Sequence, residues 1–158
     1  AFDPRGVVAR AYAAPLDQAA TVLALVSDPE LVAAADPVGL YLLGQAASCV
    51  GEVHVAGRLC GAASDGLRAE GRLTTLTHAL RIRAWAALRT GAWDASSAAA
   101  AETVRLTRET RQPVLEADAL SAQASCFSGS VTFAPWPPPA AKSASCVAND
   151  SAGASIAA

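Results

Sequence analysis

The stretch from Gly51 to Gly91 decides the fold: GEVHVAGRLCGAASDGLRAEGRLTTLTHALRIRAWAALRTG. Gly51, Gly71 and Gly91 follow one another at steps of twenty residues. Glycine just past the end of a helix supplies the left-handed backbone turn that other residues resist. The spacing therefore predicts helices over 52–70 and 72–90, joined by a tight turn.

Similar signals continue on both sides of this stretch. Asp28-Pro29 and Asp36-Pro37 each pair an N-cap acid with proline at the first helical position. We predict further helices over 16–27, 37–50, 92–110 and 113–125.

The chain also repeats itself. A shift of forty residues superposes Gly51 on Gly91, Ala79-Leu80 on Ala119-Leu120, and Arg68 on Arg108. A period of about forty residues with two helices per unit is typical of a helical solenoid. We therefore predict an all-α fold, a tetratricopeptide-like solenoid of about three α-α hairpins followed by an irregular C-terminal tail.

The apolar periodicity agrees with stacked hairpins. Within 72–90 one helical stripe contains Leu73, Leu76, Leu80, Ala84, Ala87 and Leu88. Ile82 and Trp85 lie off this stripe, and a helix that is apolar on more than one side packs between neighbours. The stripe in 92–110 is lined mainly with alanine, and such small side chains let helices approach closely.

These patterns divide the chain into three regions. We predict an N-terminal helical segment over 1–36, helical-repeat hairpins over 37–125, and a tail over 126–158 that is rich in proline, alanine and serine. Proline cannot continue a helix, and the tail contains Pro135-Trp136-Pro137-Pro138-Pro139. We expect this tail to be disordered or extended, and a frame-shifted end is an alternative.

Composition excludes several classes of protein. The net charge is -2 and 16% of the residues are charged, unlike a disordered chain. No apolar run reaches the roughly 20 residues of a membrane span, and no signal peptide is visible. We therefore expect a cytoplasmic protein with no membrane contact.

No group of residues in the sequence suggests a catalytic site or a metal site. The four cysteines, which lack C-x-x-C spacing and a clustered histidine, are Cys49, Cys60, Cys126 and Cys146. Ser64-Asp65 and His78 lack the strained turn and oxyanion hole of a nucleophilic enzyme. We predict no catalytic residue, no metal site, no cofactor and no enzyme activity.

One unit fits the tetratricopeptide pattern well. Its matching positions are Leu43-Gly44, Ala47, Gly51, Val53, Ala56, Cys60 and Ala63. The stretch from Leu40 to Leu120 resembles the central helical-repeat region of the large ATP-dependent LuxR-type transcriptional regulators of actinobacteria. The residues that carry this resemblance are 66–73 (GLRAEGRL), 83–88 (RAWAAL), 91–94 (GAWD) and 107–113 (TRETRQP).

The resemblance implies a parent protein with an N-terminal P-loop domain and a C-terminal helix-turn-helix DNA reader, of which this chain supplies part of the middle. The segment from Gly39 to Ala46 has G-x-x-x-x-G spacing but lacks the lysine that reaches phosphates. We therefore expect no contact with ATP or nucleic acid.

Residues 68–111 hold eight arginines and four acidic residues, an excess of four positive charges. One interpretation is that these arginines form a solvated helix face with spaced ion pairs, such as Arg105 with Glu109. The other is that they form a basic strip that binds an acidic partner. The predicted partner groove is lined from the first helix of each hairpin by Tyr41, Gln45, Arg81, Arg83 and Trp85.

We expect a non-catalytic scaffold for protein interaction or signal sensing, with a peptide or a partner domain in this groove. A pocket for a small-molecule inducer is one alternative. A truncated product without independent function is another.

Overall fold

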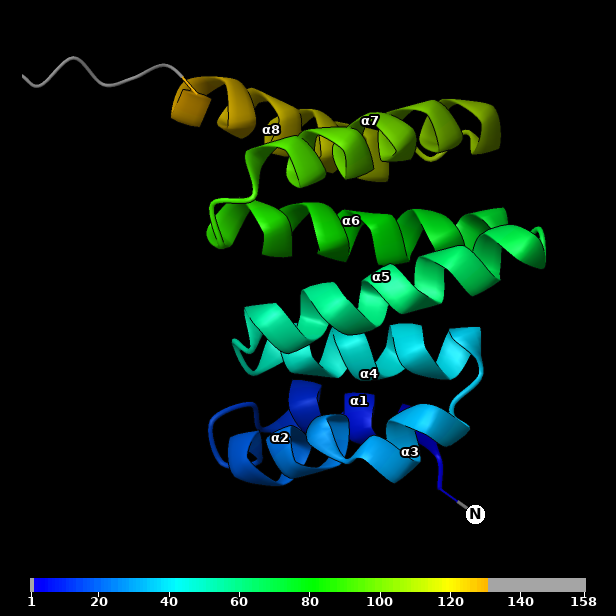
Figure 1. The fold of residues 1–158 in the computed structure, drawn as a ribbon, viewed down its shortest axis with the longest axis vertical. Helices are drawn as coiled ribbons and strands as arrows, with labels where there is room; N and C mark the ends of the chain where they lie inside the picture. Colours follow the sequence, from blue (N-terminus) through cyan, green and yellow to red (C-terminus); the bar gives the residue numbers. More distant parts are fainter. Residues whose placement is uncertain (1, 131–158) are drawn as a thin grey trace, which may run out of the picture.

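Consecutive helices stack along the long axis of the molecule (Figure 1). The computed structural model describes residues 2–130, which form eight helices and no strand. These helices are α1 (Pro4–Ala13), α2 (Ala19–Ser27), α3 (Pro29–Ala34), α4 (Pro37–Cys49), α5 (Val53–Ala69), α6 (Leu73–Arg89), α7 (Trp93–Thr110) and α8 (Pro113–Ser130). The all-α prediction is confirmed for this part of the chain.

The helix ends from α4 to α7 share one turn geometry. Gly51, Gly71 and Gly91 have φ values of 88°, 69° and 76°, which suit glycine because it lacks a Cβ atom. After each glycine, the next residue donates its N–H to a carbonyl five residues earlier, at 2.9 Å: Glu52 to Ala47, Arg72 to Leu67, and Ala92 to Ala87. Gln112 bonds to Thr107 in the same way, although Arg111 occupies the glycine position with φ 56°. The turn therefore recurs every twenty residues, as the sequence predicts.

Helices α4 and α5 approach each other most closely at Gly44. A Cβ atom on Gly44 would lie 2.5 Å from Cys60 Sγ. One on Gly66 would lie 2.5 Å from Pro37 Cγ. Glycine at these two positions leaves room for the side chains of Cys60 and Pro37 to lie against the backbone of the facing helix.

Helix α6 is the centre of the stack. It packs against α5 and α7 and also contacts α4 and α8. Leu76, Leu80, Ile82 and Ala84 are buried on more than one side of it, which confirms the predicted inner helix. Ser96 of α7 joins this core through its hydroxyl, which donates to the Ala84 carbonyl at 2.8 Å.

The N-terminal region, predicted to be helical over 1–36, contains two helices for which the sequence analysis gives no range, α1 and α3; the start of α3 is marked there by Asp28-Pro29. Both begin with an N-cap aspartate followed by proline. Asp3 accepts a hydrogen bond from the Arg5 amide, and Asp28 accepts from the amides of Glu30 and Leu31. Helix α3 has only six residues, which is too short for apolar periodicity to reveal it.

Helix α8 continues to Ser130, five residues past the helix end predicted at residue 125. Cys126 is buried, and its thiol donates to Ser96 Oγ at 3.2 Å. Ser121, Ser125 and Ser128 each donate a hydroxyl hydrogen bond to the carbonyl four residues earlier, so these polar residues remain within the helix. The predictions for the rest of the tail, 131–158, lie outside the described residues.

None of the helices within residues 2–130 combines the length and apolar character that a bilayer crossing requires.

Candidate partner-binding face

Four of the five predicted groove residues lie where α1, α4, α6 and α8 meet. Tyr41 and Gln45 belong to α4, and Arg81 and Trp85 belong to α6. The forty-residue shift places Tyr41 at the same repeat position as Arg81, and Gln45 at the same position as Trp85. Equivalent positions on stacked helices point to one side of the stack, which brings these residues together.

Aromatic and polar contacts join α1, α4 and α6. The rings of Tyr41 and His78 have centroids 6.3 Å apart and planes inclined by 40°. Gln45 Nε2 donates to the Tyr12 hydroxyl of α1 at 2.9 Å. His78 and Tyr12 are absent from the predicted groove, although His78 lies one turn before Arg81 on the same helix.

Asp118 of α8 extends this face. Its Oδ2 accepts a hydrogen bond from Trp85 Nε1 at 3.0 Å and forms an ion pair with an Arg81 terminal nitrogen at 3.7 Å. Asp118 is also missed by the sequence prediction. The repeat could have found it, since forty residues separate His78 from Asp118. We call these residues the α4–α6–α8 face: Tyr41, Gln45, His78, Arg81, Trp85 and Asp118.

Arg83 does not belong to this face. Two residues along a helix correspond to about 200° of rotation, so Arg83 points away from both Arg81 and Trp85. It lines a separate hollow between α5 and α6, beside His54 and Arg58.

A cleft of about 280 Å³ opens beside Trp85. Its lining, which we call the Trp85 cleft, consists of Ser48, Val53, Ala56, Arg81, Ile82, Trp85, Ala86 and Arg89. Arg81 Nε is buried and has no hydrogen-bond partner. The 3.7 Å ion pair with Asp118 is too long for a hydrogen bond. Arg81 therefore lines the cleft with a buried Nε that has no partner and a terminal nitrogen that is paired with Asp118.

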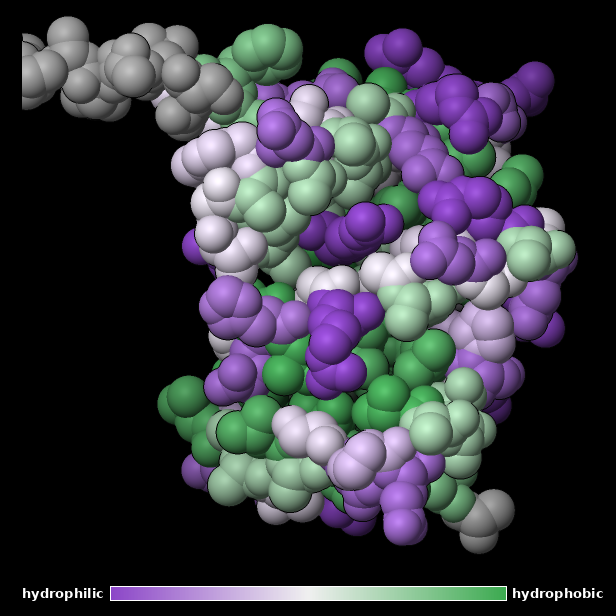
Figure 2. Space-filling model, viewed as in Figure 1, coloured by the Kyte–Doolittle hydropathy of each residue, from purple (hydrophilic) through white to green (hydrophobic). Residues whose placement is uncertain are grey.

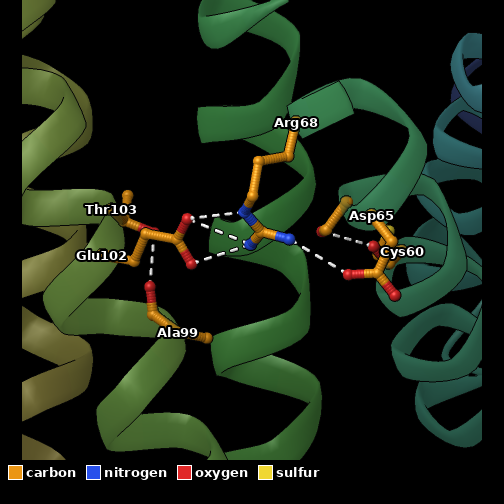
Figure 3. Close-up of polar contacts among 7 residues, drawn as sticks. Cys60, Asp65, Arg68, Ala99, Glu102 and Thr103 are labelled. Carbon is orange, nitrogen blue, oxygen red and sulfur yellow. Dashed lines mark hydrogen bonds and ion pairs between the residues drawn. The ribbon is translucent and has the colours of Figure 1, made fainter. Parts of the chain in front are cut away.

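Four of the eight other arginines between α5 and α8 form ion pairs with acids. Arg68 of α5 forms ion pairs with Asp65 and with Glu102 of α7, each at 3.0 Å (Figure 3). The predicted pair of Arg105 with Glu109 is confirmed at 2.9 Å. Further pairs join Arg72 to Glu70 and Arg108 to Glu116. Hydrophilic side chains gather at the edge that carries the α5–α6 and α7–α8 turns, at the upper right of Figure 2.

Within the described residues, Arg58, Arg83 and Arg89 form no ion pair. Arg89 lines the Trp85 cleft, and Arg58 and Arg83 line the hollow beside it. Three of the six arginines without an ion pair in residues 2–130 therefore lie on α5 and α6, and of these three only Arg89 lines the Trp85 cleft.

Burial sets the charge state of the titratable groups near Arg81. Burial lowers the pKa of His78, and the positive charge of Arg81 lowers it further. Burial raises the pKa of Tyr41, against the opposing effect of Arg81. Burial raises the pKa of the Cys60 thiol to about 12, so this cysteine lacks the thiolate character of a nucleophile. The positive charge of this region is therefore carried by arginine.

No family model, curated protein or solved structure matches the chain. The resemblance to LuxR-type regulators consequently depends on the quoted residues alone. Among residues 2–130, no group of three or more histidine, cysteine or acidic side chains lies close enough to hold a metal ion.

Proposed function

We propose that this chain is a non-catalytic, tetratricopeptide-like scaffold that binds an extended acidic segment of a partner protein along the α4–α6–α8 face. The observation that carries the proposal is Arg89, which is exposed, lines the Trp85 cleft and forms no ion pair within the described residues. Arg81 lies beside it in the same cleft and is paired with Asp118 at 3.7 Å. Exposed charge that the chain does not neutralise itself is available to a partner.

The recurrent turn supports the scaffold part of this proposal. Four turns with the same hydrogen bond follow one another at steps of twenty residues, and from α4 to α8 each helix packs on the next helix in the sequence. In helical-repeat proteins, equivalent helices line an extended surface that receives a partner.

The chemistry of the cleft supports an acidic ligand. Arg81 and Arg89 stand one turn before and one turn after Trp85 on α6, so both guanidinium groups flank an aromatic ring. Guanidinium groups bind carboxylates through paired hydrogen bonds. Asp118 places a negative charge at the α8 side, which disfavours acidic groups there and gives the ligand a direction.

A peptide fits this cleft better than an enclosed inducer does. Small-molecule pockets typically have volumes of roughly 300–1,000 Å³ and mostly apolar walls. The Trp85 cleft lies at the lower end of this range, at about 280 Å³, and is open at the surface; five of its eight lining residues are apolar, and Arg81 and Arg89 also stand in its wall. These properties favour a side chain of a longer ligand that continues along the surface.

The experiment is fluorescence anisotropy with labelled peptides of equal length that are rich in glutamate, lysine or serine. We expect the glutamate peptide to bind most tightly and to weaken as salt rises. Arg89→Gln weakens this binding by about tenfold, in line with a charged contact. Arg105→Gln is the matched control, since Arg105 is paired with Glu109 away from the cleft. Equal binding of all three peptides, or equal loss in both variants, contradicts the proposal.

The family assignment is also a proposal. We propose that the chain is part of the helical region of a cytoplasmic LuxR-type regulator, supported by segments such as 66–73 and 107–113. Sequencing of the flanking gene tests this: a P-loop motif upstream and a helix-turn-helix downstream are expected. A truncated product without function would instead melt over a broad temperature range without cooperativity.

A further inference from the structure

A second hollow, of about 210 Å³, opens between α5 and α6 beside the Trp85 cleft. Arg58 of α5 and Arg83 of α6 both line it, and no acidic side chain of residues 2–130 does. We call it the α5–α6 hollow, and its lining includes His54, Gly57, Arg58, Arg83, Ala87 and Thr90. Arg81 and Arg89 line the cleft but not this hollow.

The packing of α6 on α5 brings the two arginines to one face of α5. Gly61 follows Arg58 by three residues, so these two positions share that face. A Cβ atom on Gly61 would lie 3.9 Å from Arg83 Nε, and the guanidinium group of Arg83 therefore lies over α5 at this glycine. His54, four residues before Arg58, continues the same face. Three side chains with N–H donors thus line one side of the hollow.

Small residues leave room beside these donors. A Cβ atom on Gly57 would lie 3.2 Å from the Ala86 Cβ atom, so glycine allows α5 and α6 to approach closely here. Gly57, Ala86 and Ala87 carry no side chain longer than a methyl group. A ligand group can therefore reach the guanidinium groups without displacing a larger side chain at these positions.

Neither arginine is neutralised by the rest of the described chain. Among residues 2–130, neither side chain forms a hydrogen bond or an ion pair. Arg105 has an acid, Glu109, four residues away, whereas the residues three and four away from Arg58 and Arg83 include no acid. Like charges on facing helices repel each other. An anion bound between them removes this repulsion.

The end of α6 also borders the hollow, and its carbonyl groups are already engaged. The Ala86 carbonyl accepts from the Thr90 amide at 3.2 Å, and the Ala87 carbonyl accepts from the Ala92 amide at 2.9 Å. The Thr90 hydroxyl donates to the same two carbonyls at 3.1 Å. These oxygens therefore present little free negative charge to an anion in the hollow.

Two guanidinium groups fit a phosphate group better than a carboxylate. A carboxylate has two oxygens, and one arginine can pair with both of them. A phosphate monoester has three strong acceptor oxygens and about two negative charges near neutral pH, so it can pair with two arginines at once. The opening of the hollow at the surface leaves space for the group that carries the phosphate.

We propose that the α5–α6 hollow binds the phosphate group of a phosphate monoester. Arg58 and Arg83 pair with its oxygens, and His54 supplies a further donor. This site does not depend on the partner-binding role of the Trp85 cleft.

A titration of the isotopically labelled full chain with glycerol phosphate, followed by NMR at constant ionic strength, tests this proposal. We expect saturable shifts of the Gly57 and Arg58 amide signals and of the Arg83 Nε–H signal. Acetate should bind at least about tenfold more weakly, since it cannot pair with both arginines. A phosphoserine peptide carries the same group, and its affinity relative to glycerol phosphate distinguishes a partner protein from a small molecule as the source.

Variants separate this site from general attraction to positive charge. Arg58→Gln and Arg83→Gln should each weaken binding by about tenfold or more, and Arg58→Lys should restore only part of it because lysine lacks the planar fork. The matched control is Arg89→Gln, because Arg89 also forms no ion pair within residues 2–130 but lines the Trp85 cleft. This control should keep phosphate binding while losing affinity for the glutamate peptide, so the two proposals fail separately.

Arg58 is exposed, so circular dichroism should show unchanged helix content for Arg58→Gln. Three results overturn the proposal: a natural chain without saturable shifts in the hollow, equal affinity for acetate and glycerol phosphate, or equal effects of Arg58→Gln and Arg89→Gln on phosphate binding. The last result indicates attraction to the overall charge of the surface instead of a site.

Discussion

Replacing Arg111 by glycine should stabilise the protein. Arg111 has φ 56° and ψ 50°, in the left-handed region, at the turn position that glycine occupies in the three preceding turns. A residue with a Cβ atom adopts this conformation at a cost of about 1–2 kcal/mol. Glycine avoids that cost but loses about 0.5–1 kcal/mol more conformational entropy on folding. We therefore expect Arg111→Gly to increase the free energy of unfolding by about 0.5–1 kcal/mol.

The structure offers little to offset this gain. The Arg111 side chain is exposed and forms no ion pair within residues 2–130. The hydrogen bond that closes the turn, from the Gln112 amide to the Thr107 carbonyl, uses only backbone atoms and remains in the variant. Urea unfolding followed by circular dichroism measures the change, as a midpoint that rises by about 0.2–0.5 M.

Two glycine-to-alanine variants test the same reasoning in opposite directions. A Cβ atom on Gly71 or on Gly6 would meet no other atom within 4 Å. Gly71 has φ 69°, so Gly71→Ala should lower stability by about 1 kcal/mol. Gly6 lies within α1, so Gly6→Ala should raise stability by about 0.5–1 kcal/mol. The reasoning is refuted if Arg111→Gly is neutral or destabilising, or if both alanine variants change stability in the same direction.

Three further predictions follow from close packing and burial. Gly66→Ala should lower the free energy of unfolding by about 1–3 kcal/mol, measured by urea unfolding, because its Cβ atom would lie 2.5 Å from Pro37 Cγ. His78 has a lowered pKa in the folded state, so the unfolded chain binds the proton first and stability falls as pH drops below about 6.5; His78→Gln should flatten this pH dependence in thermal melts. Burial holds the pKa of Cys60 at about 12 in the folded state, against an ordinary value of 9.0, so its stabilising contribution is present below pH 9 and is lost as pH rises toward 12. In the folded protein at pH 8, Cys60 should therefore react with a thiol reagent more slowly than Cys49, which mass spectrometry of the labelled peptides would detect.

The sequence predicts the helices from α4 to α7 to within three residues at each end. The reason is local: the turn glycines and the N-cap aspartates act through backbone geometry that a few neighbouring residues determine. Helices α1 and α3 carry the same Asp-Pro signal, but α3, at six residues, is too short to show apolar periodicity. The sequence analysis ends α8 five residues too early. Cys126 near the end of α8 is buried against Ser96 of α7, and a local sequence pattern does not show such a tertiary contact.

The candidate face was predictable in part. A shift of forty residues relates Tyr41 to Arg81, and Trp85 lies one turn after Arg81 on the same face of α6. The prediction that Arg83 lines this face is wrong, because a step of two residues along α6 turns the side chain to the opposite side. The role of Asp118 depends on how α8 crosses α6, and that crossing is determined by side-chain packing between helices distant in sequence. The sequence therefore identifies the helix that carries the face but not all of the groups that complete it.

Stacking in chain order has a consequence for how the molecule opens. Each helix from α4 onward packs mainly on the helices adjacent in sequence, so a terminal helix can detach while the remaining ones keep their neighbours. Helix α6, with partners on both sides, has no such route. Amide hydrogen exchange should consequently be slowest in α6 and faster toward either end of the stack. The terminal helices should therefore unfold before the central ones.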